Sequence, residues 1–93
     1  MSHINFNDIR SEALFASTLQ PSEEPTVAQV RREIKRTVRH LGVCGCAARM
    51  AQEFGDAPYW AAARMRWARS LVADTFTAPP ARTLMATIRQ SAA

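Results

Sequence analysis

The chain has few of the residues on which several classes of protein depend. Its 93 residues include two cysteines and two histidines, too few for a disulfide scaffold or a histidine-rich metal centre. No apolar run exceeds a few residues, which excludes a transmembrane helix. The first residues lack the basic and then apolar order of a signal peptide. We therefore expect a soluble, cytoplasmic protein that does not bind membranes.

Patterns that indicate catalysis are also missing. There is no glycine-rich phosphate loop, no spacing pairs a nucleophile with a base, and only eight carboxylates are available for acid–base roles. A short chain folded into helices also has little room for a cleft. The sequence therefore predicts a protein that is not an enzyme and that has no cofactor.

What the chain does have is positive charge concentrated in its middle. The net charge is +4, and eleven of the twelve cations are arginine, whose planar fork suits phosphate and carboxylate. Residues 1–30 have a net charge of −3, whereas residues 31–69 have a net charge of +6. A binding surface for an anionic partner is therefore expected in the central part of the chain.

The local patterns are helical throughout. Period-2 alternation and hairpin turns are absent, and alanine is abundant. We predict an all-α fold: a compact bundle of four helices, with a fifth at the C-terminus left open. Residues 1–76 form one helical domain, and residues 77–93 form a proline-containing linker followed by a tail or short helix. The four helices are predicted over residues 7–20, 26–41, 46–54 and 57–75.

The best-defined element is the helix at 26–41. Thr26 and Gln29 have the spacing of a capping box, and Gly42 is expected to end the helix, with a bend over residues 43–46. The helix at 57–75 has apolar residues over about half its circumference, so it is expected to be central. The expected buried residues on these helices are Ile34, Leu41, Phe54, Met65, Trp67 and Val72.

Ala51 is followed four residues later by Gly55, between two expected helices. In a helix-turn-helix, a small residue at the first position lets the next helix pack closely, and a glycine at the second starts the turn. The segment 26–76 therefore resembles a helix-turn-helix DNA-binding domain of small bacterial regulators. Asp56 and Arg64 depart from the pattern, because apolar residues are usual there. Close packing of three helices without any DNA also explains the alanine and the glycine.

The helix-turn-helix interpretation assigns two groups of residues to DNA. One group faces the groove and the other contacts phosphates; the first is Tyr59, Arg66 and Arg69, and the second is Arg32, Arg36 and Arg39. An acidic protein would recognise the same arginines equally well, so DNA and an acidic protein both remain open as partners. The alternative function is a protein-interaction module or homodimer that uses the apolar face of the helix at 57–75.

Two smaller features complete the candidate sites. Cys44 and Cys46, with His40 upstream, are weak metal candidates because a zinc site needs four ligands. We predict that both cysteines are reduced thiols without metal, and redox reactivity stays open. Arg64 lies in the middle of an apolar arc, so it needs a partner; the available carboxylates are Glu33, Glu53 and Asp74.

Several short segments between residues 14 and 72, given below, resemble those of short, uncharacterised all-helical proteins of high-GC actinobacteria. This resemblance implies a lineage and a cytoplasmic location but no activity. It is carried by Leu14–Ser17, Pro25, Gln29–Val30, Gly45–Ala48, Glu53–Asp56, Pro58 and Arg64–Ala68.

Overall fold

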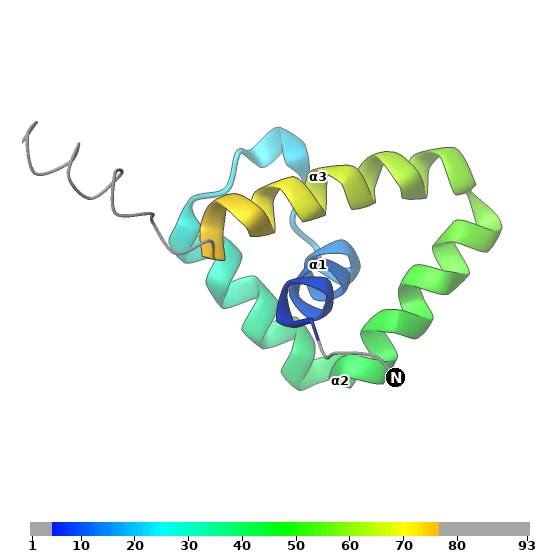
Figure 1. The fold of residues 1–93 in the computed structure, drawn as a ribbon, viewed down its shortest axis with the longest axis horizontal. Coiled ribbons are helices and arrows are strands. Elements are labelled where there is room, and N and C mark those ends of the chain that lie inside the picture. The colour runs from blue at the N-terminus through cyan, green and yellow to red at the C-terminus, as the bar shows by residue number, and fades with distance from the viewer. Residues whose placement is uncertain (1–4, 77–93) are drawn as a thin grey trace, which may run out of the picture.

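A computed structural model describes residues 5–76 of the chain, and these residues form three α-helices and no strand. The helices are α1 (Phe6–Ala16), α2 (Val27–Asp56) and α3 (Pro58–Phe76), with a single 3₁₀ turn, η1 (Pro21–Glu23), between α1 and α2. Figure 1 shows the two halves of α2 and the whole of α3 as three sides of a triangle, with α1 inside it. The predicted all-α class is confirmed. The prediction for residues 77–93 lies outside the described residues.

Helix α1 is shorter than the predicted span of 7–20. The side chain of Asn5 caps its start by accepting hydrogen bonds from the backbone amides of Asn7 and Asp8 at 2.9 and 3.3 Å. At the other end Ser17 is extended, and its hydroxyl donates to the carbonyl of Leu14 at 2.7 Å. This hydroxyl competes with helical hydrogen bonding, so α1 ends at Ala16.

Helix α2 begins as predicted but continues further. The Thr26 hydroxyl accepts from the Gln29 amide at 3.2 Å, and the Gln29 side chain accepts from the Thr26 amide at 2.8 Å, so the capping box is confirmed. Gly42 alone departs from helical geometry, with φ 78° and ψ 164°, a conformation that is open to glycine. Helical structure resumes directly afterwards, so the predicted bend at 43–46 is wrong. The predicted helices at 26–41 and 46–54 are two halves of one kinked element, and the helices number three rather than four.

The corner between α2 and α3 lacks two features of a helix-turn-helix. Ala51 is exposed, so it does not support the packing of α3, and Gly55 is still helical instead of starting the turn. The break consists of Ala57 alone, which has φ −146° and ψ 72°. The sequence predicts Pro58 within the first turn of this helix, and Pro58 is the first residue of α3, where its missing N–H has no partner to lose. The helix-turn-helix resemblance is therefore not confirmed at these two positions, since small residues occur on exposed helix surfaces as well as at close contacts.

The hydrophobic core forms where α2 and α3 enclose α1. Its central helix is α1, and α3, predicted to be central, forms one side of the triangle. Ile34, Met65 and Val72 are buried as predicted, and Phe54 and Trp67 are partly buried. The core consists of Ala13, Leu14, Phe15, Leu19, Val30, Ile34, Cys46, Ala61, Met65, Ala68 and Val72.

The prediction for Leu41 is wrong, because 37% of this residue is exposed. The prediction assumed that the apolar stripe along residues 26–41 faces the core as far as Leu41, its last residue. Gly42 follows Leu41 directly, and the helix changes direction at this corner (Figure 1). Leu41 therefore lines an open hollow between the two halves of α2, beside Thr37 and Arg49, and is not covered by the core.

Candidate functional site

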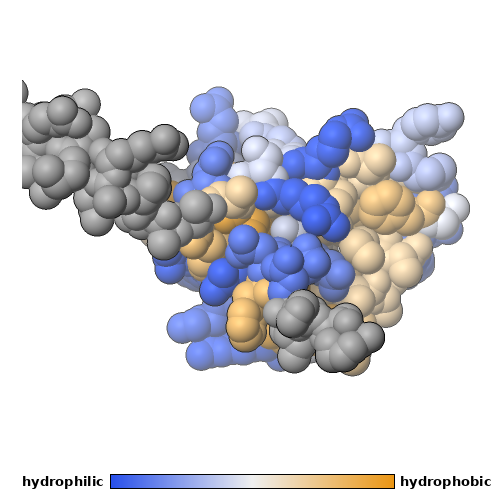
Figure 2. Space-filling view, in the orientation of Figure 1, coloured by the Kyte–Doolittle hydropathy of each residue, from blue (hydrophilic) through white to orange (hydrophobic). Residues whose placement is uncertain are grey.

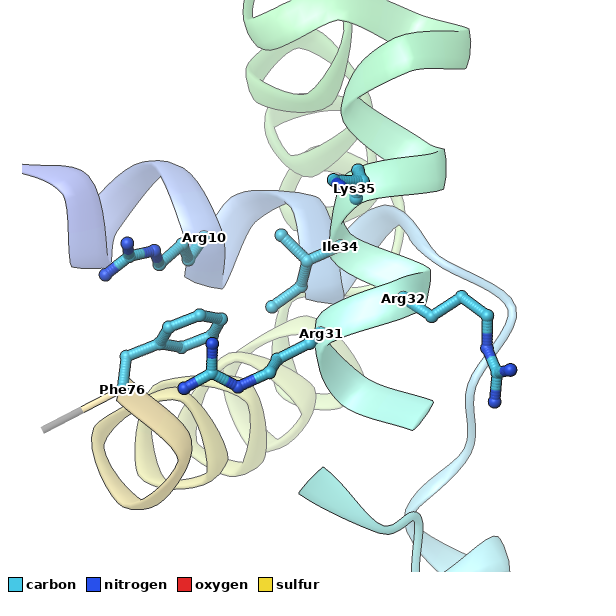
Figure 3. Close-up of a pocket in the computed structure, with 6 residues that line it drawn as sticks. All are labelled: Arg10, Arg31, Arg32, Ile34, Lys35 and Phe76. Carbon is cyan, nitrogen blue, oxygen red and sulfur yellow. The ribbon is translucent and has the colours of Figure 1, made fainter. Parts of the chain in front are cut away.

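Two arginines from different helices meet on the ring of Phe76, the last residue of α3. The guanidinium carbon of Arg10 lies 4.1 Å from the ring centroid, and that of Arg31 lies 4.8 Å from it. Figure 3 shows both side chains directed at the ring, one from α1 and the other from the start of α2. Stacking on an aromatic face holds a guanidinium by its plane and leaves the N–H donors at its edge available.

Further cations complete an open hollow around this ring, which we call the basic hollow. Its volume is about 490 Å³. Of the described residues that line it, four are cations and none is a carboxylate. In Figure 3 the side chain of Arg32 points away from Phe76 toward solvent, so the positive charge spreads outward along α2. The lining residues are Arg10, Arg31, Arg32, Ile34, Lys35 and Phe76.

Each of the two stacked arginines also donates one hydrogen bond. Nη2 of Arg31 donates to the carbonyl oxygen of Thr75 at 3.4 Å, at the C-terminal end of α3, where a cation is favourable. Nη1 of Arg10 donates to the Asn7 side chain at 3.1 Å. Each arginine therefore has one contact that orients it and further donors that face outward.

The carboxylate nearest in sequence to the lining cations of α2 is already paired. Glu33 accepts from Nη2 and Nε of Arg36 at 2.7 and 3.2 Å. This hydrogen bond, together with the charge of Glu33, raises the pKa of Arg36. Of the predicted phosphate contacts, Arg32 therefore lines the basic hollow, Arg36 is held in an ion pair, and Arg39 is exposed further along α2.

The residues predicted to read the groove lie on α3. Tyr59 is 92% exposed, and Arg66 is exposed. Arg69 donates to Asp8 of α1 at 3.3 Å, two residues before Arg10. Arg69 is therefore paired with a carboxylate and does not line the basic hollow. Figure 2 shows hydrophilic side chains across the middle of one face and hydrophobic ones gathered over the second half of α2, on the right.

Arg64 is 5% exposed, and its partners are backbone carbonyls rather than the predicted carboxylates. Its Nε donates to the carbonyl of Phe15 at 2.8 Å. Its Nη2 donates to the carbonyls of Leu14, Ser17 and Leu19 at 3.4, 3.0 and 2.8 Å. These acceptors follow from the early end of α1, whose last carbonyls lack helical donors. The expected pairing with Glu33, Glu53 or Asp74 is therefore wrong.

The surroundings of this guanidinium are aromatic. Its carbon lies 4.9 Å from the ring centroid of Trp67 and 5.8 Å from those of Phe15 and Trp60. Burial lowers the pKa of Arg64, the charge of Arg49 lowers it further, and Glu53 opposes this change. An arginine remains charged under these conditions, so Arg64 brings a permanent positive charge to the C-terminal end of α1.

The cysteines occupy opposite environments. Cys44 is exposed, Cys46 is 1% exposed, and both are free. Side chains two positions apart on a helix are rotated by about 200°, which explains the difference. Burial, followed by the charge of Glu12, raises the pKa of the Cys46 thiol. His40 is exposed, and residues 5–76 contain no group of three or more His, Cys, Asp or Glu that would hold a metal ion.

The apolar face of α3, predicted as an alternative interface, is used inside the molecule. Ala61, Met65, Ala68 and Val72 are all buried in the core. On α3, the large hydrophobic side chains that are exposed lie at the beginning of the helix, at Tyr59 and Trp60. A homodimer through the face between Ala61 and Val72 is therefore not proposed.

Sequence reasoning missed Arg10 and Phe76 as parts of one site. Arg10 belongs to the acidic first third of the chain, and Phe76 was assigned to an apolar arc. Their association depends on how the end of α3 and the start of α2 lie beside Arg10 of α1, which no spacing within one helix reveals.

Within the described residues, no helix combines the length and the apolar character needed to cross a membrane. No protein-family model, curated protein or solved structure matches this chain. The resemblances stated from the sequence therefore remain predictions.

Proposed function

We propose that this protein binds nucleic acid through the basic hollow, as a small regulatory or accessory protein. The observation that carries the proposal is the convergence of four cations from two helices on one hollow that no described carboxylate lines. Contacts to phosphates supply affinity without reading bases, so the expected binding is largely independent of sequence. No catalytic step is part of the proposal.

The stacked pair is the feature best suited to phosphate. Arg10 and Arg31 are already held on the Phe76 ring, so little side-chain freedom is lost when they bind an anion. The planar fork of arginine donates two parallel hydrogen bonds to phosphate oxygens. Arg32 and Lys35 extend the charge along α2 toward neighbouring phosphates.

Nucleic acid is favoured over an acidic protein because four of the six described residues that line the hollow are cations and none is a carboxylate. Ile34 is 7% exposed and Phe76 is partly covered, and the remaining lining residues are charged. Protein interfaces typically have a centre depleted of charge and built around buried aromatic or aliphatic anchors. A concentration of Arg and Lys side chains, as in this hollow, is typical of phosphate-backbone binding.

The proposal does not depend on a helix-turn-helix. Ala51 and Gly55 lack the roles that this motif requires. Groove contacts by Tyr59, Arg66 and Arg69 stay predictions from the sequence. Phosphate contacts by Arg32 and its neighbours need only an exposed cationic surface.

Fluorescence anisotropy with labelled duplex DNA and single-stranded RNA tests the proposal. The double variant Arg32→Gln with Lys35→Gln removes two lining charges without removing a structural contact. Arg66→Gln with Arg49→Gln removes two charges outside the hollow, together with the exposed Arg49–Glu53 ion pair, and is the charge-matched control. We expect the first variant to weaken binding about tenfold or more, and the control to change it less than about twofold.

Competition separates the two classes of partner. Unlabelled DNA should displace the labelled probe at a much lower charge concentration than polyglutamate does. Equal displacement by polyglutamate would favour an acidic protein and overturn the proposal. So would the absence of any binding at low salt, or equal losses in the two double variants.

A further inference from the structure

A second hollow lies at the C-terminal end of α1 and shares no lining residue with the basic hollow. Its volume is about 230 Å³, and its walls include Phe15, Gln20, Trp60 and the guanidinium side chain of Arg64. A smaller hollow of about 150 Å³ adjoins it and shares Gln20, Trp60 and Arg64. We call the pair the Arg64 hollow.

One edge of the Arg64 guanidinium remains available to a ligand. Nε and Nη2 donate to four backbone carbonyls, whereas Nη1 has no acceptor among the described residues. In the described part of the chain, Thr75 Oγ1 is the sole fully buried side-chain nitrogen or oxygen without a partner. Nη1 is therefore not fully buried, and Arg64 lines both parts of the hollow.

The local charge favours one negative charge in a ligand. Nε of Arg49 donates to Glu53 at 3.3 Å, and both residues line the hollow beside Arg64. Two cations face one carboxylate, which leaves a net positive charge that a monoanion neutralises.

The walls of the hollow add an apolar preference. The rings of Phe15 and Trp60 meet edge to face, with centroids 5.9 Å apart, and half of Trp60 is exposed. An exposed tryptophan beside a cation is a favourable contact for an apolar group attached to an anion.

We infer that the Arg64 hollow binds a carboxylate carried on a short apolar or aromatic group. Nη1 of Arg64 donates to the carboxylate, and Trp60 contacts the apolar part. The carboxylate comes either from a small carboxylic acid or from the C-terminus of a peptide. This inference uses no residue of the basic hollow and does not rest on nucleic-acid binding.

Benzoate and benzamide are the probes, because they have the same shape and differ in charge. The readout is the ¹H–¹⁵N signal of the Arg64 guanidinium, whose burial slows proton exchange. We expect benzoate to shift this signal in a saturable way, whereas benzamide leaves it unchanged. Equal effects of the two compounds, or no shift with benzoate, would overturn the inference.

Variants around the arginine extend the test without removing it. Glu53→Gln removes the competing carboxylate and should tighten benzoate binding about fivefold. Trp60→Ala should weaken it, and Arg66→Gln, on the exposed side of α3, should leave it unchanged. Weaker binding in Glu53→Gln, or unchanged binding in Trp60→Ala, would contradict the inference.

A short peptide that ends in phenylalanine distinguishes the two sources of the carboxylate. Tighter binding of this peptide than of benzoate, abolished when its C-terminus is amidated, identifies a peptide terminus as the ligand. Benzoate binding at least as tight as that of the peptide identifies a small carboxylic acid. Binding of the amidated peptide as tightly as the free acid would contradict the carboxylate site.

Discussion

At the scale of single residues, Arg64 connects α3 to the end of α1. Its position in an apolar arc correctly predicts that it is buried and partnered, because an isolated buried charge is too costly. The identity of the partners could not be predicted. The carbonyls of Phe15, Ser17 and Leu19 are available because α1 ends early, at a place set by a serine hydroxyl and not by helical periodicity.

Replacing Arg64 with methionine should destabilise the fold strongly. The change keeps much of the side-chain volume but leaves several partly or fully buried carbonyls without a donor, at a cost of about 3 kcal/mol. Urea denaturation monitored by circular dichroism measures this free energy. Arg66→Met, an exposed change on the same helix, should stay within about 0.5 kcal/mol of the wild type. A similar small change for Arg64→Met would show that the carbonyl contacts contribute little.

The two cysteines should differ in reactivity at neutral pH. Cys46 is buried and its thiol pKa is raised, so it forms less thiolate, which is the reactive species. Cys44 is exposed. A colorimetric disulfide reagent should therefore modify one thiol per folded chain rapidly and the second only after denaturation. Cys44→Ser should abolish the rapid phase; its survival in that variant would contradict the assignment.

At the scale of helices, the sequence predicted where α2 and α3 begin, but it did not predict where α1 and α2 end or how the helices pack. The Thr26 capping box and Pro58 at the start of α3 depend on a few neighbouring residues, and both are confirmed. The exposure of Leu41 and of Ala51 depends on where the kink and the corner direct each half of α2. A sequence pattern indicates which side of a helix is apolar but not which elements cover it.

Alanine substitutions at Gly42 and Gly55 should have opposite effects. Gly42 has a positive φ that L-residues rarely adopt, so Gly42→Ala should destabilise by about 1–3 kcal/mol. Gly55 is helical, and an added Cβ would meet nothing within 4 Å, so Gly55→Ala should stabilise by about 0.5–1 kcal/mol. Thermal and urea denaturation of both variants measures the difference. A neutral Gly42→Ala would mean that α2 is not kinked there.

At the scale of the whole molecule, the basic hollow exists because three helices end or begin beside one another. The sequence predicted the positive charge on α2, and Arg32 lies where a phosphate contact was expected. It could not predict that Arg10 of the acidic first third joins this surface through Phe76. It also could not predict the ion pair between Asp8 and Arg69. Both contacts depend on tertiary structure.

The salt dependence of DNA binding tests the central claim most directly. Each phosphate contact adds about 0.9 to the slope of log K against log salt concentration for duplex DNA. Removing Arg32 and Lys35 together should lower the magnitude of that slope by about 2. The control that removes Arg66 and Arg49 should leave it unchanged. Equal slopes for all three proteins, or a larger loss in the control, would contradict binding through the basic hollow.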